Sequence, residues 1–260
     1  MQGTKRIAAN TVYLYIRLIF VLVISLFTVR VILKALGDVD YGIYNIVCGF
    51  VSMFGFLNTS MTNGVQRFYN YSIGKDGAES IRKVYTASLS IQAVLAVLLV
   101  IVVEAVGVWY VNNIMVLPDD KLTVANYLFQ FSLIGLLLSF LQIPYSAIVL
   151  AYEKMNFYAL VGIIDAVAKL VIAYVVMLAP DRLFHYGILL LGINILNFCL
   201  FFFYSRYNFK NLILDKRPDK QLVKEMLSFT GWNTFGSFAY VIRWQGVNVL
   251  MNAFFGVIVN

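Results

Sequence analysis

Residues 12–36 read VYLYIRLIFVLVISLFTVRVILKAL, an apolar stretch that contains only three charged side chains. Because an α-helix rises 1.5 Å per residue, about 20 such residues cross the roughly 30 Å hydrocarbon core of a bilayer. The stretch is also longer than the core of a secretory signal peptide, which has about 7–15 apolar residues. We therefore predict that it forms a membrane-spanning helix that stays in the protein.

Similar apolar stretches continue along the chain. Of its 260 residues, 61% are hydrophobic and 13% are charged, and the mean hydropathy is +0.82. A soluble domain has about 25% charged residues. The expected spans are 11–36, 41–69, 84–111, 123–150, 157–179 and 187–204, and a seventh begins near residue 228. The predicted fold is therefore all-α, a polytopic transmembrane helical bundle of six helices plus the start of a seventh.

The basic residues are distributed unevenly over the two sides of this predicted bundle. The connections alternate between the sides, and the side opposite the N-terminus has only Lys34, Lys121 and Arg182. The N-terminal side has Lys5, Arg6, Arg67, Lys75, Arg82, Lys83, Lys154, Arg206, Lys210, Lys216, Arg217, Lys220 and Lys224. Short cytoplasmic loops are enriched in Lys and Arg, which places the N-terminus in the cytoplasm. The net charge of +7 marks this side, and we predict no nucleic-acid partner.

The longest polar connection divides the chain. We expect a six-helix transmembrane lobe over 1–204, a cytoplasmic linker over 205–227, and the first helix of a second lobe over 228–260. The segment Gly231-Trp232-Asn233-Thr234 echoes Ala8-Ala9-Asn10-Thr11 at the opening of the first span, which is weak evidence for a repeat. The expected second lobe would then be missing beyond residue 260.

Arginines lie inside two of the predicted spans, Arg17 in the first and Arg243 in the seventh. An unpaired charge at mid-membrane costs about 2.5–3.5 kcal/mol on insertion scales, so such residues usually face a bundle interior or water. The five N–H donors of arginine are not satisfied by one hydroxyl, and its charge persists at any relevant pH. Both side chains are predicted to line a hydrated cavity.

A polar stripe follows the second predicted span. Asn45, Ser52, Thr59 and Asn63 recur at spacings of seven and four, so they share one face of a helix, and Arg67 lies at its cytoplasmic end. Asn233 begins a similar stripe on the seventh span. We predict that these residues bind substrate. The alternative is that they hold helices together, because small and polar residues are common at helix contacts in lipid.

Three further charged residues are candidates for ion coupling. Asp165 and Lys169 are four residues apart in the fifth span, so they can pair on one face, and a purely structural pair is the alternative. Glu104 has no partner in its own helix. It is a candidate for proton coupling, or it is a neutral carboxyl held by a hydrogen bond.

The sequence lacks the usual machinery of catalysis. It has no phosphate-binding glycine loop followed by Lys-Ser/Thr, and His185 is its only histidine. Cys48 and Cys199 lie in separate apolar runs, so neither a disulfide nor a metal site is predicted. We expect no enzyme activity, no catalytic residue, no metal and no cofactor.

Three segments resemble a known family. Residues 36–45 (LGDVDYGIYN), 58–68 (NTSMTNGVQRF) and 252–260 (NAFFGVIVN) are similar to the bacterial polysaccharide flippases of the Wzx type. These proteins belong to the multidrug/oligosaccharidyl-lipid/polysaccharide exporter superfamily and have two six-helix lobes with a MATE-like fold. The resemblance covers the whole chain, which has the length of one lobe plus a helix and so corresponds to the N-terminal portion of the family's proteins.

This resemblance implies a function. It implies a bacterial inner-membrane flippase that moves undecaprenyl-diphosphate-linked oligosaccharide by alternating access, with a cationic cleft for the diphosphate. Arg17, Arg67 and Arg243 match the arginines of that cleft by span and residue type. The implied partners are the lipid-linked oligosaccharide, the membrane lipids and the missing C-terminal lobe, in lipopolysaccharide or other polysaccharide biosynthesis.

Three alternatives remain open. A cation-coupled multidrug exporter of the same superfamily is expected to have acidic residues in its cavity. A membrane enzyme of polysaccharide assembly is expected to have acidic or His residues in a large outer loop, whereas the outer loops here are short. Half a transporter could also insert into the membrane without transporting anything.

Overall fold

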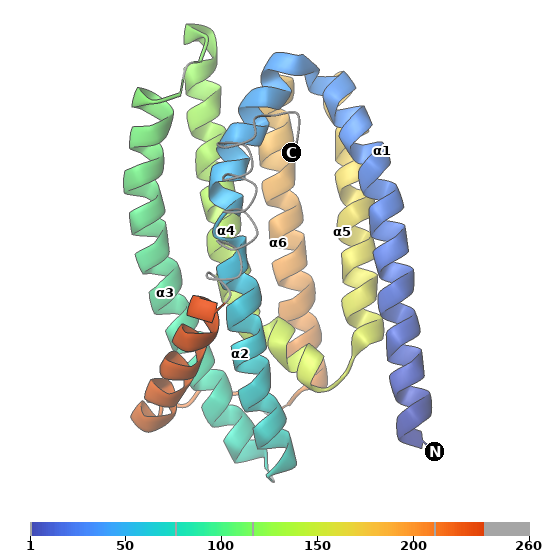
Figure 1. Ribbon diagram of the computed structural model, residues 1–260, viewed down its shortest axis with the longest axis vertical. Helices are drawn as coiled ribbons and strands as arrows, with labels where there is room; N and C mark the ends of the chain where they lie inside the picture. Colours follow the sequence, from blue (N-terminus) through green and yellow to red (C-terminus); the bar gives the residue numbers. More distant parts are fainter. Residues whose placement is uncertain (1, 76, 116, 211, 237–260) are drawn as a thin grey trace, which may run out of the picture.

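The computed structural model describes residues 2–75, 77–115, 117–210 and 212–236. These residues form a bundle of long helices without strands (Figure 1). The helices are α1 (Gln2–Ser52), α2 (Gly55–Gly74), α3 (Ala78–Asn113), α4 (Leu122–Ala151), α5 (Met155–Val175) and α6 (Arg182–Asn208). Short 3-10 turns cover Asp119–Lys121 and Val176–Leu178, and a further helix covers 220–236. Most of the expected seventh span, including Arg243, lies outside the described residues.

Helix α1 folds back on itself at Gly37. Gly37 has φ 75°, in the left-handed region, where a residue with a Cβ is strained by about 1–2 kcal/mol. Nothing lies within 4 Å of where its Cβ would be, so the backbone angle and not the space requires glycine. Figure 1 shows the first arm (2–36) rising, the turn, and the second arm (38–52) descending into α2.

The described helices are long and apolar enough to cross a membrane. Five segments qualify, the first of them the 70 residues of Lys5–Gly74. A straight helix of that length would measure about 105 Å, more than three times the hydrocarbon core. Because the segment turns back at Gly37, each of its two arms is long enough for a separate crossing. The prediction of an all-α, multi-pass membrane protein is confirmed.

Helix α4 is the centre of the bundle. Its most apolar window is 61% buried, against 11% in the Lys5–Gly74 segment. The reason is that α4 packs against α6, α3 and α2 at once, whereas the first arm of α1 packs mainly on α5. Many exposed side chains of that arm, such as Leu18, Leu22 and Leu26, are apolar, which suits contact with lipid.

The two ends of the bundle differ in the number and the contacts of their basic side chains. At the Gly37 end, Lys121 forms an ion pair with Asp40 at 2.8 Å, and Arg182 donates to the carbonyl oxygen of Ala35 at 2.9 Å. These contacts tie the α1 turn to the α3–α4 connection and to α6. The connections α2–α3 and α4–α5 lie at the opposite end, beside the N-terminus, where most of the Lys and Arg are (Figure 1).

Candidate functional site

Two cavities lie inside the bundle, one toward each end. The arginine cavity, of about 360 Å³, is in the half near the N-terminus and is lined by Arg17, Val21, Asn58, Thr59, Thr62, Asn63, Gln142, Ser146, Leu150, Tyr158, Val161, Gly162, Asp165, Asn197 and Phe201. The lysine cavity, of about 280 Å³, is in the half near the Gly37 turn, between α1, α4 and α6, and includes Lys169. Residues of α1, α2, α4, α5 and α6 meet in the first of these.

The cationic side chain of the arginine cavity lies over an aromatic ring, in space that a glycine leaves open. The Arg17 guanidinium lies over the ring of Tyr158, 4.6 Å from its centroid. One turn further along α5, a Cβ at Gly162 would overlap the Arg17 side chain, so the glycine provides the room that it needs. The Arg17 Nε is buried without a hydrogen-bond partner among the described residues. The structure therefore places a guanidinium with an unused donor on the cavity wall.

The same cavity contains a carboxylate whose two oxygens are both bound. Asp165 Oδ2 forms an ion pair with Lys169 Nζ at 2.8 Å, and Asp165 Oδ1 accepts a hydrogen bond from Asn197 Nδ2 at 2.7 Å. Asn197 Oδ1 is buried without a partner among the described residues. The cavity thus offers a free donor from Arg17 and a free acceptor from Asn197, and its lining contains one cation and one anion.

A polar layer separates the two cavities. Asp165 lines the arginine cavity and Lys169 the lysine cavity, so their ion pair bridges the two. A second bridge is the hydrogen bond from Asn58 Nδ2 to the carbonyl oxygen of Ser139, at 2.9 Å. These two contacts join residues that line the two cavities.

The predicted stripe of the second span is split by the structure. Thr59 and Asn63 line the arginine cavity, whereas Ser52 lines the lysine cavity and donates to the carbonyl oxygen of Gly49 at 2.8 Å. Asn45 is exposed and lines neither cavity. The cause is a turn at residues 53–54 between α1 and α2, which ends one helix and begins the next, so the stripe does not continue along one face.

Arg67 and Asn233 lie at the contact between α2 and the helix over 220–236. The Arg67 guanidinium lies 4.1 Å from the centroid of the Phe229 ring. Asn233 Nδ2 donates to the carbonyl oxygen of Ser60 at 2.9 Å and contacts its Oγ at 3.0 Å. Neither residue lines the arginine cavity, and both hold the two helices together in this structure.

Glu104 lies in the seam between α3 and α4, away from both cavities. Its Oε1 accepts a hydrogen bond from Gln130 Nε2 at 2.8 Å. Its Oε2 is buried without a partner among the described residues. In this arrangement the carboxyl group links two packed helices.

Several lining residues were not among the sequence candidates. Tyr158 and Gly162 precede Asp165 and Lys169 on α5 at spacings of four, three and four, which places all four on one helical face. Asn197 is an amide in an apolar run, a residue type that is costly in lipid and usually functional or hydrogen-bonded. The α5 spacing could have indicated this face, but only the tertiary contact shows that Arg17 lies over it.

The lining of the arginine cavity offers charge, hydrogen-bonding groups and an aromatic face. Among the described residues, no three His, Cys, Asp or Glu side chains come together as a metal site would require. Its polar atoms come from Arg17, Asp165 and Asn197, with the hydroxyls and amides of Thr59, Asn63 and Gln142 around them. Such a lining suits a polar or charged solute with several hydrogen-bonding groups.

Comparison with known proteins identifies the fold. The structure matches two solved chains, each over 95% of this chain and 56% of theirs. One is a multidrug resistance MATE family transporter of the MOP superfamily in an outward-facing conformation, with a TM-score of 0.74 and 13% identity. The other is a MOP superfamily transporter from Pyrococcus furiosus, with a TM-score of 0.69 and 12% identity, and the reverse polarity of its binding pocket suggests a different function for that protein.

The chain spans 56% of the length of these solved transporters, and at such low identity the likeness shows the fold alone. No curated protein gives a significant sequence match. The sequence profile of the MatE family matches residues 14–175, which is more than half of the chain and includes Arg17, Tyr158, Gly162 and Asp165. The chain therefore belongs to the MatE family.

Proposed function

We propose that this chain is one half of a bacterial inner-membrane flippase, with its N-terminus in the cytoplasm, that moves oligosaccharide linked to a lipid diphosphate. The MatE match and the fold of MOP superfamily transporters support a transport role. The chain spans 56% of the solved transporters, so a second lobe would complete the path, and alternating access would occur between the two. The basic residues gathered at the N-terminal end support the orientation.

The observation that carries the proposal is the position of Arg17. A diphosphate is anionic, and arginine binds phosphate oxygens through paired, charge-assisted hydrogen bonds. The Arg17 guanidinium is fixed over Tyr158 and forms no ion pair with a described carboxylate. Its charge and its buried Nε are available for a ligand, while Asn63, Thr59 and Asn197 lie on the same cavity for sugar hydroxyls.

Asp165 and Lys169 are the proposed coupling pair. Their ion pair belongs to both cavities, so a proton or cation that binds Asp165 would release Lys169 and loosen the polar layer. Arg67 and Asn233 would contact substrate only in a conformation in which α2 and the helix over 220–236 have separated. Asn45 and Ser52 would contact it from the second arm of α1, on the side of the lysine cavity. Arg243 would contribute from the second lobe.

A cation-coupled multidrug exporter is the second candidate function, and Asp165 is the observation that favours it. An acidic residue in the cavity would attract an organic cation, whereas Arg17 would repel one. The two residues therefore support different substrates. For the Pyrococcus furiosus transporter, reversed pocket polarity likewise suggests a different function.

The test exchanges Arg17 in the native bacterium. Arg17→Ala is expected to abolish export of surface polysaccharide, and Arg17→Lys to retain part of it, because lysine keeps the charge without the paired donors. The matched control is Arg30→Ala, which removes an exposed arginine of the same arm of α1 outside either cavity. Membrane insertion is measured in all three variants by fractionation and immunoblotting.

The same strains separate the two candidate functions. If the flippase proposal holds, loss of the protein leaves the efflux of ethidium-like dyes unchanged while polysaccharide export stops. Normal polysaccharide with slower dye efflux would favour the multidrug exporter. Normal export in the inserted Arg17→Ala variant would contradict the role of Arg17.

A further inference from the structure

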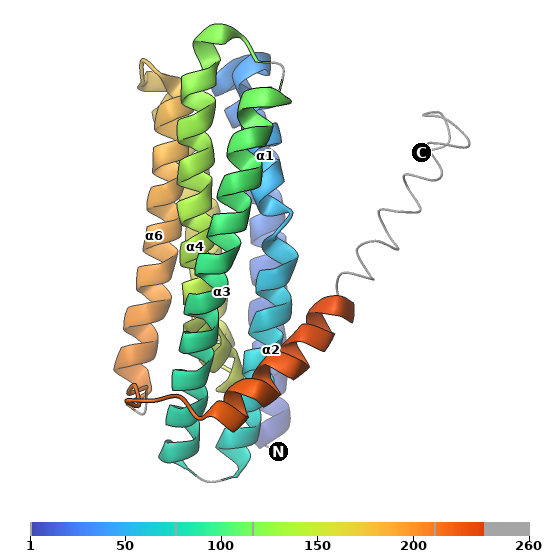
Figure 2. The ribbon, with the colours of Figure 1, turned by 90° about the vertical axis from the view of Figure 1, so that its left-hand side faces the viewer.

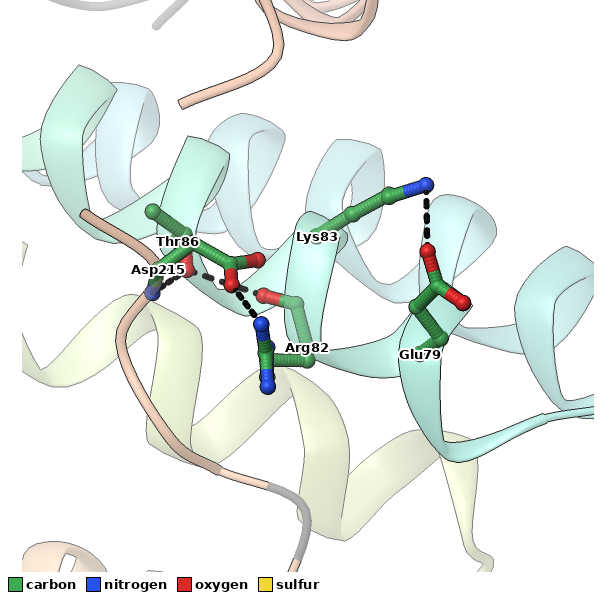
Figure 3. Close-up of polar contacts among 5 residues, drawn as sticks. All are labelled: Glu79, Arg82, Lys83, Thr86 and Asp215. Carbon is green, nitrogen blue, oxygen red and sulfur yellow. Dashed lines mark hydrogen bonds and ion pairs between the residues drawn. The ribbon is translucent and has the colours of Figure 1, made fainter. Parts of the chain in front are cut away.

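The connection between α6 and the helix over 220–236 is fixed against the start of α3 (Figure 3). The Asp215 carboxylate forms an ion pair with the Arg82 guanidinium. The Asp215 backbone N–H donates to Thr86 Oγ1 at 2.9 Å, and Thr86 donates in turn to the carbonyl oxygen of Arg82 at 3.0 Å. Asp215 is thus held through both its side chain and its main chain.

The preceding residues of the connection are fixed as well. The Arg206 guanidinium donates to the carbonyl oxygen of Leu212, whose side chain is buried. The Phe209 ring is stacked on Tyr152 of the α4–α5 connection, with ring centroids 4.6 Å apart. Phe209, Leu212 and Asp215 are therefore each held by a contact, and the residues after Asp215 start from a fixed position.

Four basic residues follow Asp215 and define a surface that we name the basic rim: Lys216, Arg217, Lys220 and Lys224. All four are exposed, and none forms an ion pair with a described residue. The neighbouring acids are occupied by other groups. Asp215 pairs with Arg82, Glu79 pairs with Lys83 at 2.8 Å, Asp219 accepts from the backbone of Gln221 at 2.9 Å, and Glu225 accepts from the Gln221 side chain at 3.2 Å. Asp219 and Glu225 accept only from neutral N–H groups and keep their negative charge, so the four cations of the rim against these two acids leave a net charge of +2.

An apolar surface continues from the basic rim along the same helix. Lys220, Lys224, Leu227, Gly231 and Phe235 follow one another at spacings of four, three, four and four, which is a single helical stripe. Leu227 is 42% exposed and Phe235 63%, and Trp232 beside them is 73% exposed. The stripe changes from cationic to apolar and aromatic along the helix axis.

The opposite face of this helix is occupied by α2, which fixes the direction in which the stripe points. Thr234 Oγ1 lies 3.1 Å from Ser60 Oγ, and Thr230 lies where a Cβ at Gly64 would be. The ring of Phe229 meets that of Phe68 edge to face, with centroids 6.0 Å apart. In Figure 2 the helix lies obliquely beside the foot of α2 and α3, at the N-terminal end of the bundle.

We infer that the basic rim binds the headgroup of an anionic phospholipid, with an acyl chain lying along Leu227, Trp232 and Phe235. Cations at headgroup depth followed by aromatic and aliphatic side chains at greater depth are the pattern of a helix that enters a membrane interface. A row of unpaired Lys and Arg beside a membrane attracts anionic lipids. The proposal depends on the membrane-spanning fold and not on which solute is transported.

The test uses the whole chain in lipid nanodiscs with Trp232 as the reporter. Trp109→Phe and Trp244→Phe leave Trp232 as the only tryptophan, because the chain has three. Phosphatidylglycerol or phosphatidylcholine with brominated acyl chains is added at increasing mole fraction to a phosphatidylcholine disc, and quenching of Trp232 is recorded. We expect half-quenching at a lower mole fraction of the brominated phosphatidylglycerol, and a smaller difference in high salt.

Two double variants locate the effect. Lys220→Gln with Lys224→Gln is expected to raise the half-quenching fraction of phosphatidylglycerol by at least about fivefold, since each lysine near an anionic surface contributes about that factor. The control, Lys5→Gln with Lys154→Gln, removes the same charge at the same end of the bundle from exposed lysines outside described ion pairs, and should change it little.

Three results would overturn the inference. Equal half-quenching by the two brominated lipids in the parent would remove the preference for anionic headgroups. Equal shifts in both double variants would mean that the whole basic end attracts lipid without a site at the rim. Protection of Trp232 from both lipids would mean that protein, either another copy or the second lobe of the proposed function, covers the surface.

Discussion

The arginine cavity and the α3–α4 seam each contain an acidic side chain inside the membrane, and the surroundings of the two differ. Asp165 lies on a cavity of about 360 Å³, with both oxygens bound and a guanidinium on the same lining. Glu104 lies between two packed helices, bound to Gln130 through one oxygen. Close by in the seam, Gly107 faces the Phe129 ring so closely that a Cβ would overlap it.

The difference shows that the packing around a charged side chain indicates its role better than its position within a predicted span. In the seam, a small residue and a ring fill the space, so the Glu104–Gln130 bond serves helix association. In the cavity, Gly162 leaves space for the long cationic side chain of Arg17, which comes from the neighbouring helix α1. We therefore expect substitutions in the cavity to change transport, and substitutions in the seam to change stability.

The largest effect is expected at Asp165. Asp165→Ala removes the partner of Lys169 and of Asn197 in one step and leaves a lysine that is 45% exposed without its counter-charge. Transport should fall by at least about a hundredfold, because the loss of a coupled charge pair typically costs several kcal/mol, reduced here by solvent around Lys169. The measurement is initial export rate at equal amounts of inserted protein.

Asp165→Asn is the companion variant. It keeps an oxygen for the hydrogen bond from Asn197 but removes the charge that holds Lys169. Export should lose its dependence on the proton or cation gradient while insertion is unchanged. Retention of normal gradient dependence would contradict the assignment of Asp165 and Lys169 as the coupling pair.

The second effect concerns the space for Arg17. Gly162→Ala introduces a methyl group where the Arg17 side chain lies, so the guanidinium must leave its position over Tyr158. We expect transport to fall by about tenfold or more, because losing one charged hydrogen bond to the solute costs about 1.5–3 kcal/mol and each 1.4 kcal/mol is about tenfold. The control is Gly192→Ala on α6, where nothing lies within 4 Å of the added Cβ. An equal loss in both variants would contradict the role of Gly162.

The third effect is on stability and belongs to the seam. Gly107→Ala forces the Phe129 ring, which is fully buried, out of its position. Such overpacking typically costs about 1–3 kcal/mol, so the thermal midpoint of the purified protein should fall. Export per inserted molecule should remain close to that of the parent. A specific loss of export at unchanged stability would mean that the seam takes part in transport.

How much of this was predictable from the sequence depends on the kind of contact. The length and charge pattern of the apolar runs predict the membrane fold, because they follow from the bilayer thickness alone. Because a buried guanidinium is costly in a membrane, the sequence predicts that Arg17 lines a cavity, and the structure places it on a cavity wall. The partners Tyr158 and Gly162 were missed because they lie more than a hundred residues away from Arg17, and no local pattern pairs them. Asn45 was grouped with Thr59 because the turn at residues 53–54 left no clear signal.

The smallest effect is expected for Glu104→Gln, which sharpens the comparison most. The glutamine keeps an oxygen at the position that accepts from Gln130 Nε2, so the bond between α3 and α4 is preserved. Removing an ionisable group from the membrane lowers the cost of insertion, and we expect a change of less than about 1 kcal/mol in stability. Export and its gradient dependence should both stay within about twofold of the parent. The parent and this variant differ only in whether residue 104 can ionise. If the variant is stable and inserted but no longer responds to the gradient, ion coupling must be assigned to Glu104 in the seam and not to Asp165 in the cavity.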